Sequence, residues 1–233
     1  GTSTRRAGRE SIWVAAGTGL SRLTGFARVF VLAYAVGQSP LADLYTKANS
    51  APNLVFELVV GGVLSATLVP LFVRSREEDD PESTSVLISV GFVAAALLSL
   101  LALAATFAVD HYLHGRFTAE GGDTASTLVK LQIVTDLLYL MLPQILFYAI
   151  ASLSTAYLNA SRRYRTAALA PVLTNLVTIV AFAIVGVQLQ GDDVVLEAGQ
   201  RDLSAVLWLG LGTTAGIAAM VIPMMWAVRN SDD

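Results

Sequence analysis

Long runs of apolar residues, separated by short polar connections, cover most of the 233-residue chain. A helix needs about 20 apolar residues to cross a bilayer, and six runs reach that length. Their approximate bounds are 11–37, 42–73, 85–109, 126–158, 164–189 and 203–228. The runs are too long and continuous for the strands of a membrane barrel. The pattern therefore predicts an all-α integral membrane protein, a bundle of six transmembrane helices.

Three prolines inside the runs predict bends in the helices. Pro52 and Pro143 lie within the two runs that are longer than a simple span, and Pro171 lies near the start of the fifth run. Proline lacks a main-chain donor and its ring clashes with the preceding turn, so a helix kinks or breaks there. One turn later, Asn175 is expected to make a polar contact.

The sixth run contains Gly212 and Gly216 at GxxxG spacing. Small residues at this spacing let two helices approach closely within a membrane. We expect these glycines to serve ordinary packing within the chain.

Arginines are distributed unevenly between the polar segments that flank the runs. Nine lie in the segments on one side of the membrane, and two lie in those on the other side. The nine are Arg5, Arg6, Arg9, Arg74, Arg76, Arg162, Arg163, Arg165 and Arg229, and the two are Arg116 and Arg201. Cytoplasmic connections carry an excess of basic residues, so both ends of the chain are expected in the cytoplasm. Residues 1–10 then form a cytoplasmic segment, residues 11–229 a six-helix lobe, and residues 230–233 a cytoplasmic end.

The composition agrees with a membrane protein and excludes several kinds of site. Charged residues make up 14% of the chain and hydrophobic residues 55%, whereas a soluble domain carries about 25% charged residues. The absence of cysteine excludes disulfides and thiolate chemistry. His111 and His114 are expected to be solvated loop residues. No nucleotide-binding loop or catalytic set is present, so we expect no enzyme activity, metal, cofactor or nucleic-acid partner.

Two of the runs carry a polar stripe along one side. At 100° per residue, each stripe stays within an arc of about 120°. The first stripe comprises Ser11, Thr18, Ser21, Arg22, Gly25 and Arg28, and the second comprises Asp43, Thr46, Lys47, Ser50, Asn53, Glu57, Gly61 and Ser65. A charged residue at the centre of a span costs about 2.5–3.5 kcal/mol on insertion scales. Such residues normally face water or the bundle interior and mark a substrate or ion path.

Two interpretations of the stripes remain open. In the first, the stripes of two adjacent helices face a shared solvated cavity. In the second, the core is dry and internally neutralised, with Asp43 paired to Lys47 and Glu57 paired to an arginine. For Asp136, the single acidic residue of the fourth run, both interpretations are equally open.

Two stretches of the chain resemble the MurJ/MviN family of lipid II flippases, in the multidrug/oligosaccharidyl-lipid/polysaccharide exporter superfamily. Residues 21–72 carry the recurring family features Ser21-Arg22, Gly25-Phe26-Ala27-Arg28, Asp43, Pro52-Asn53-Leu54, Gly62 with Ser65, and Val69-Pro70. Residues 142–176 are similar to the family's fourth helix, its LNA end, the basic turn and the following APVL-N helix.

The resemblance implies a transporter that moves lipid II, the undecaprenyl-diphosphate-linked peptidoglycan precursor, across the bacterial cytoplasmic membrane by alternating access. It also implies that Arg22 and Arg28 line the central cavity and engage the diphosphate, and that Asp43 is functionally important. Guanidinium groups suit this role because they bind phosphate oxygens in a bidentate manner.

The chain departs from the family pattern in two places. Phe56 and Glu57 stand where the best-known members carry an arginine pair, and Gly61 replaces an acidic residue. The expected phosphate-binding set is therefore thinner, and Lys47 is expected to substitute for a missing arginine.

The resemblance further implies a protein of two lobes, of which this chain corresponds to the N-terminal one. We expect a fragment of a longer flippase, whose partners are the C-terminal lobe, or a second copy, and membrane lipids. Two alternative functions remain open. One is export of another polyprenyl-linked oligosaccharide or of a drug, and the other is a non-transporting membrane scaffold for cell-wall enzymes.

Overall fold

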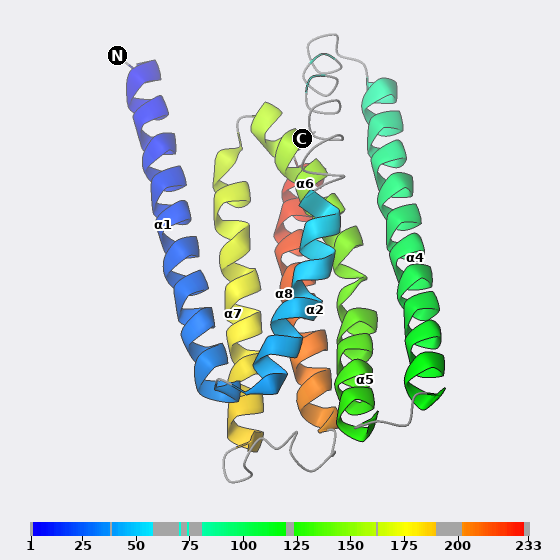
Figure 1. Cartoon of the computed structure of the whole chain (residues 1–233). Coiled ribbons are helices and arrows are strands. Elements are labelled where there is room, and N and C mark those ends of the chain that lie inside the picture. The colour runs from blue at the N-terminus through cyan, green and yellow to red at the C-terminus, as the bar shows by residue number, and fades with distance from the viewer. Residues whose placement is uncertain are drawn as a thin grey trace.

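The computed structural model describes residues 2–37, 39–57, 70, 74, 81–119, 124–161, 163–189 and 202–230. These residues form seven helices, and within the described ranges there is no strand. The helices are α1 (Thr2–Val36), α2 (Pro40–Phe56), α4 (Pro81–Ala119), α5 (Thr124–Met141), α6 (Gln144–Ala160), α7 (Tyr164–Leu189) and α8 (Leu203–Arg229) (Figure 1). The predicted all-α fold class is confirmed.

Five stretches are long and apolar enough to cross a membrane. They are Ile12–Val36, Ser89–Leu113, Thr127–Asn159, Tyr164–Leu189 and Leu203–Arg229. Each corresponds to one of the predicted runs. Of the remaining run, 42–73, the structure describes mainly the part in α2, and Ser65 lies outside the described residues.

Two helices are longer than the apolar runs that predict them. The helix α1 begins at Thr2 rather than near residue 11, and α4 continues to Ala119 rather than ending near residue 109. Because α4 includes His111, whose ring stacks on Phe107 at a centroid distance of 6.4 Å, the loop placement of the two histidines is wrong. Hydropathy marks only the part of a helix that crosses lipid, while main-chain hydrogen bonds continue beyond it.

The fourth predicted run is broken at Pro143. Leu142 and Pro143 separate α5 from α6. The N–H of Ile145 donates to the carbonyl of Leu142 at 3.1 Å, and that of Leu146 donates to the carbonyl of Pro143 at 3.2 Å. These bonds span three residues rather than four, because proline cannot continue the helical ladder.

The other two prolines do not interrupt their helices. Pro52 lies inside α2, and Pro171 lies inside α7. A bend of the helix axis at either proline stays a prediction.

The helices pack side by side, with α7 and α8 at the centre (Figure 1). The helix α1 packs along α7, while α5 and α6 pack against α8. The outer helix α4 contacts α5 and α6, and α2 lies across these same two helices. Both ends of the chain and the α6–α7 connection lie at one end of the bundle (Figure 1).

Close contact between α7 and α8 depends on two glycines. A methyl group added at Gly212 would clash with the side chain of Ala181, and one at Gly216 would lie 2.8 Å from the carbonyl oxygen of Thr174. The expected packing role of the two glycines within the chain is confirmed.

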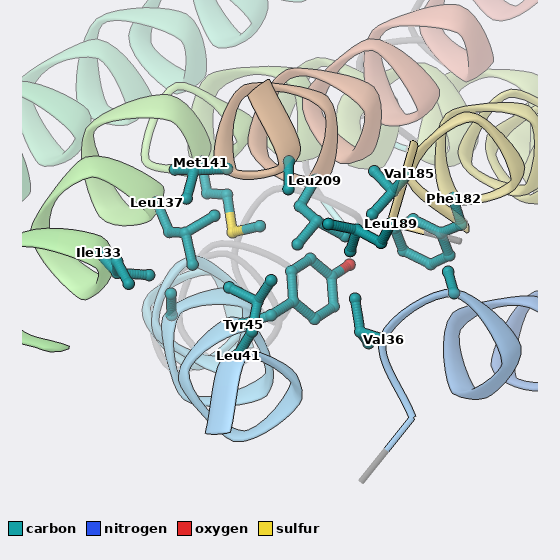
Figure 2. Close-up of a cluster of buried hydrophobic side chains, with 14 residues drawn as sticks. Val36, Leu41, Tyr45, Ile133, Leu137, Met141, Phe182, Val185, Leu189 and Leu209 are labelled. Atoms are coloured by element: carbon teal, nitrogen blue, oxygen red, sulfur yellow. The ribbon is translucent and has the colours of Figure 1, made fainter. Parts of the chain in front are cut away.

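Buried side chains form an apolar cluster near the α1–α2 turn, a second cluster toward the other end, and a polar level between them. The first cluster joins α1, α2, α5, α7 and α8 (Figure 2). The second joins α6, α7 and α8. Along these last three helices, the positions between the clusters include four buried polar residues, here called the middle layer: Gln144, Asn175, Thr178 and Thr213.

Candidate functional site

The turn at Gly37 fixes where α1 ends and where α2, with its polar stripe, begins. Gly37 adopts φ +58° after the last residue of α1, a conformation that costs glycine little. Ser39 caps α2 by accepting a hydrogen bond from the N–H of Ala42 at 3.4 Å. Asp43 is exposed in the first turn of α2, where the helix dipole favours a negative charge.

Most of the predicted site residues lie on the surface of the described bundle. Arg22, Asp43, Lys47, Ser50 and Glu57 are exposed, and Arg28 and Asn53 are half-buried. Two of these side chains bond within their own helix: the Ser50 hydroxyl donates to the Thr46 carbonyl at 2.7 Å, and the Asn53 amide donates to the Asn49 carbonyl at 3.1 Å. The charged side chains of Arg22, Asp43, Lys47 and Glu57, being exposed, can face water or another part of the protein.

The charges of the two stripes are not neutralised by one another. In the ranges that the structure covers, no ion pair joins Asp43 to Lys47 or Glu57 to an arginine. Asp136 is half-buried on α5. The internal pairs of the dry-core interpretation are thus not formed by the described residues.

The polar side of α1 is divided between α7 and the surface. The Asn175 amide of α7 donates to the Ser21 carbonyl and to the Thr24 hydroxyl, each at 3.0 Å. This is the polar contact expected of Asn175. The helices α1 and α2 touch mainly near their turn and diverge beyond it (Figure 1). Arg22, which lies on α1 away from the turn, is exposed.

Arg28 is half-buried on α1. No hydrogen bond or ion pair joins Arg28 to another described residue. Tyr45 is 5% exposed, and its hydroxyl lies 3.0 Å from the Thr213 hydroxyl of α8. Its ring packs edge-to-face on Phe182 at 5.5 Å, and its oxygen points into the core (Figure 2).

Sequence reasoning missed Tyr45, a buried residue whose hydroxyl contacts the Thr213 hydroxyl of α8. An aromatic residue within an apolar run is read as ordinary core, because its ring fits there. The available signal was the hydroxyl, since a buried tyrosine needs a hydrogen-bond partner. A buried tyrosine on α2 therefore indicates a polar group on a helix packed against it.

Polar side chains also hold the break between α5 and α6 against α8. Gln144 is fully buried, and its amide donates to the Thr214 hydroxyl at 2.9 Å. That hydroxyl donates in turn to the Leu140 carbonyl at 2.7 Å. Thr214 thus supplies a donor where the helical ladder is broken, and this fixes the start of α6.

Two basic residues at the end of the bundle that holds both termini, Arg163 and Arg165, make structural contacts. The Arg163 guanidinium donates to the Asn230 carbonyl at 2.9 Å and so satisfies the C-terminal end of α8. Arg165 lies over the ring of Trp13, 5.2 Å from its centre, and links α7 to α1.

A pocket of about 510 Å³ lies elsewhere, between α7 and α8. Its lining is apolar apart from Ser204 and includes Val180, Trp208 and Leu211. Such a lining cannot bind a charged group. Across the described helices, no three histidine, aspartate or glutamate side chains gather as a metal site requires.

Five stretches able to cross a membrane, one of which carries Arg22 and Arg28 without an ion-pair partner among the described residues, define a multi-pass helical membrane protein with a polar face inside its spanning region. The chain belongs to the MurJ family, because the family profile described as "Lipid II flippase MurJ" matches residues 32–232.

Curated relatives support this membership. The chain is 30% identical over 190 residues to the lipid II flippase MurJ of Burkholderia cenocepacia, covering 78% of this chain and 35% of the relative. It is 28% identical over 174 residues to a probable lipid II flippase MurJ of Rhizobium tropici, covering 74% of this chain and 32% of the relative. It is 25% identical over 202 residues to a probable lipid II flippase MurJ of Vibrio cholerae, covering 85% of this chain and 38% of the relative.

The chain spans about a third of the length of these curated relatives. No solved structure matches it significantly. The family and the five spanning stretches indicate a multi-pass protein of the bacterial inner membrane.

Proposed function

We propose that this chain is the N-terminal lobe of a transporter that moves lipid II across the bacterial cytoplasmic membrane by alternating access. The family match and the names of the relatives support this assignment. The polar face on α1 and α2 then forms one wall of the transport path, and the C-terminal lobe, or a second copy, supplies the other. Both termini lie in the cytoplasm, and the protein needs no cofactor and is not an enzyme.

One observation carries the proposal: Arg22 and Arg28 lie within a spanning stretch without an ion-pair partner among the described residues. Two guanidinium groups facing lipid would each cost several kcal/mol. They are tolerated if they face a solvated path, and there they can bind a diphosphate through paired hydrogen bonds.

Each predicted site residue has a role in this proposal. Arg22, Arg28 and Lys47 bind the diphosphate. The residues that line the polar path are Asp43, Ser50, Asn53, Glu57 and Ser65. The proline positions at which helices bend are Pro52, Pro143 and Pro171. No observation on the molecule favours export of another lipid-linked sugar or drug, or a scaffold role.

Growth of cells depleted of their own flippase tests the phosphate-binding role. Arg28→Ala in the full-length gene should abolish growth, and Arg28→Lys should restore it in part, because lysine keeps the charge but loses the bidentate geometry. Arg229→Ala, at the exposed end of α8, is the control and should support growth. Normal growth with Arg28→Ala, at unchanged membrane abundance, would contradict the proposal.

Cysteine labelling tests whether the polar face is solvated, because the chain has no cysteine of its own. Cysteines at positions 22 and 43 should react with water-soluble thiol reagents. A cysteine at position 97 should not, since Leu97 is 61% exposed on the spanning part of the outer helix α4 and faces lipid. Equal resistance at all three positions would favour the dry interpretation.

A further inference from the structure

One side of α8 points out of the described bundle. Thr213 contacts Tyr45 of α2, at 3.0 Å between the two hydroxyls, so this residue marks the side of α8 that α2 covers. Leu211 precedes Thr213 by two residues and therefore lies about 160° away around the helix. Leu211 is 50% exposed. The side of α8 opposite α2 is thus uncovered by the described helices.

The helix α7 has an uncovered side as well. Asn175 bonds to Ser21 of α1, and Gly186 lies against Ala35, so these two residues mark the side of α7 that α1 covers. Val180 lies about 140° around the helix from Asn175 and is 60% exposed. The helices α7 and α8 therefore both expose apolar side chains next to the seam between them.

The pocket of about 510 Å³ lies on this exposed seam, and it is lined by Val180 of α7 and by Leu207, Trp208, Leu211 and Ala215 of α8, among others. Because α7 and α8 are both spanning stretches, the pocket opens to the hydrocarbon of the bilayer. Water does not suit it, since a bound water needs two to four polar partners. Ser204, the one hydroxyl among the described lining residues, donates its proton to the Gln188 side chain at 3.2 Å.

The dimensions of the pocket fit one hydrocarbon chain. Its lining extends along α8 from Ser204 to Ala215, which is about 16 Å at 1.5 Å per residue. That length is about half of the roughly 30 Å thickness of the hydrocarbon core, and it begins in the first turn of α8, at one edge of the span. A helix of about 10 Å diameter would occupy roughly 1,200 Å³ over the same length. The pocket is therefore too small for a partner helix.

We propose that the α7–α8 pocket binds an acyl chain of a membrane phospholipid, from the leaflet at the end of the bundle opposite both termini. The inference goes beyond the proposed function, because the pocket shares no residue with the polar face on α1 and α2. An acyl chain reaches about the middle of the bilayer, as the pocket does, whereas an undecaprenyl chain is far longer. Walls from two helices give the bound chain more dispersion contacts than a flat helix surface gives.

Photolabelling tests the assignment. The probe is a phosphatidylethanolamine with a diazirine on one acyl chain, present as a minor component of unlabelled phospholipid in nanodiscs that hold the full-length protein. Mass spectrometry then locates the labelled residues. Labelling at Leu211 and Ala215 should exceed labelling at Leu97 about threefold or more, because a chain held by two helices is bound more tightly than one beside a single helix. Leu97 is 61% exposed on α4 and is the reference for ordinary lipid contact.

Filling the pocket gives a second measurement. Ala215→Phe places a ring in the pocket and should reduce labelling at Leu211 to the level of Leu97. Ile222→Phe is the matched control, because Ile222 is 69% exposed on the same helix and does not line the pocket. It should leave labelling at Leu211 unchanged. Labelling at Leu97 that stays constant in both variants shows that the bundle has formed.

Each other outcome overturns the proposal. Equal labelling at Leu211 and Leu97 in the wild type would show ordinary lipid contact. Labelling at Leu97 without any in the pocket would show that protein covers this face, from the rest of the chain or from a second copy. Unchanged labelling of Leu211 in Ala215→Phe would show that the chain lies outside the pocket. If excess undecaprenyl phosphate removes the label and an equal excess of unlabelled phospholipid does not, the occupant is a prenyl chain.

Discussion

Asn175 shows how one polar side chain can hold two membrane helices together. It is 6% exposed, and its amide makes two hydrogen bonds, each of 3.0 Å, to Ser21 and Thr24 of α1. Gly25 lies beside it: a methyl group there would come within 3.5 Å of the same amide nitrogen. The contact adds to the close packing of the arginine-bearing helix on α7 at Gly17 and Gly186.

Asn175→Ala should therefore destabilise the protein by about 1 kcal/mol, the order found for hydrogen bonds between membrane helices. The measurement is the thermal unfolding midpoint in detergent. Asn159→Ala is the control, since Asn159 is exposed at the end of α6, and it should leave the midpoint unchanged. Equal midpoints for Asn175→Ala and the wild type would show that the two bonds contribute nothing.

Single residues also show what the sequence can and cannot reveal about the site. Arg22 and Arg28 could be found from sequence, because a charge within an apolar run is conspicuous. The partner of Tyr45 could not, because Thr213 lies 168 residues further along the chain. Periodicity describes one helix at a time.

At the scale of elements, the helix α8 is held on two sides. A methyl group at Gly210 would lie 2.6 Å from the Leu140 side chain, whereas Gly212 and Gly216 meet α7. The hydroxyl of Thr214 adds a hydrogen bond to the break before α6. The helix α8 is thus the common support for both of its neighbours.

Gly216→Val should force α7 and α8 apart, because the added side chain would overlap the Thr174 carbonyl. Overpacking of this kind costs about 1–3 kcal/mol. The expected result is a lower yield of folded protein, measured by size-exclusion chromatography in detergent. Ala215→Val changes the neighbouring exposed residue and should be tolerated. A normal profile for Gly216→Val would contradict the close packing.

The existence of the helices was predictable, but their ends were not. Each spanning run is apolar enough to be recognised by composition alone, and Pro143 marks the break in the fourth run. The polar extensions at the start of α1 and the end of α4 carry no such signal, so His111 was misplaced. Hydropathy identifies the part of a helix that lipid surrounds, but it does not indicate where the main-chain hydrogen bonds of that helix end.

For the whole molecule, the neighbours of each helix are the least predictable property. The two polar stripes suggest that α1 and α2 lie side by side, but α1 packs mainly on α7. Small residues determine this choice: a methyl group at Gly17 would lie 3.0 Å from the Ala168 side chain, and one at Gly186 would lie 3.2 Å from Ala35. Such complementarity between distant segments leaves no trace in local periodicity.

The proposed orientation gives a prediction for the molecule as a whole. A cysteine at position 230, beside the C-terminal end of α8, should react with a membrane-impermeant reagent only after the cytoplasmic side is opened. A cysteine at position 115, near the opposite end of the bundle, should react in intact spheroplasts. Both positions are exposed. The reverse pattern would invert the assignment that rests on the arginine distribution.

The residues of α2 lie at very different distances from the turn at Gly37 that precedes the helix. At 1.5 Å per residue, Asp43 lies about 5 Å along the helix from Pro40, and Glu57 lies about 26 Å along it. A given rotation of α2 about Pro40, its first residue, would displace Glu57 more than five times as far as Asp43. In such a rotation the carboxylate of Asp43 would stay nearly in place, and that of Glu57 would move furthest.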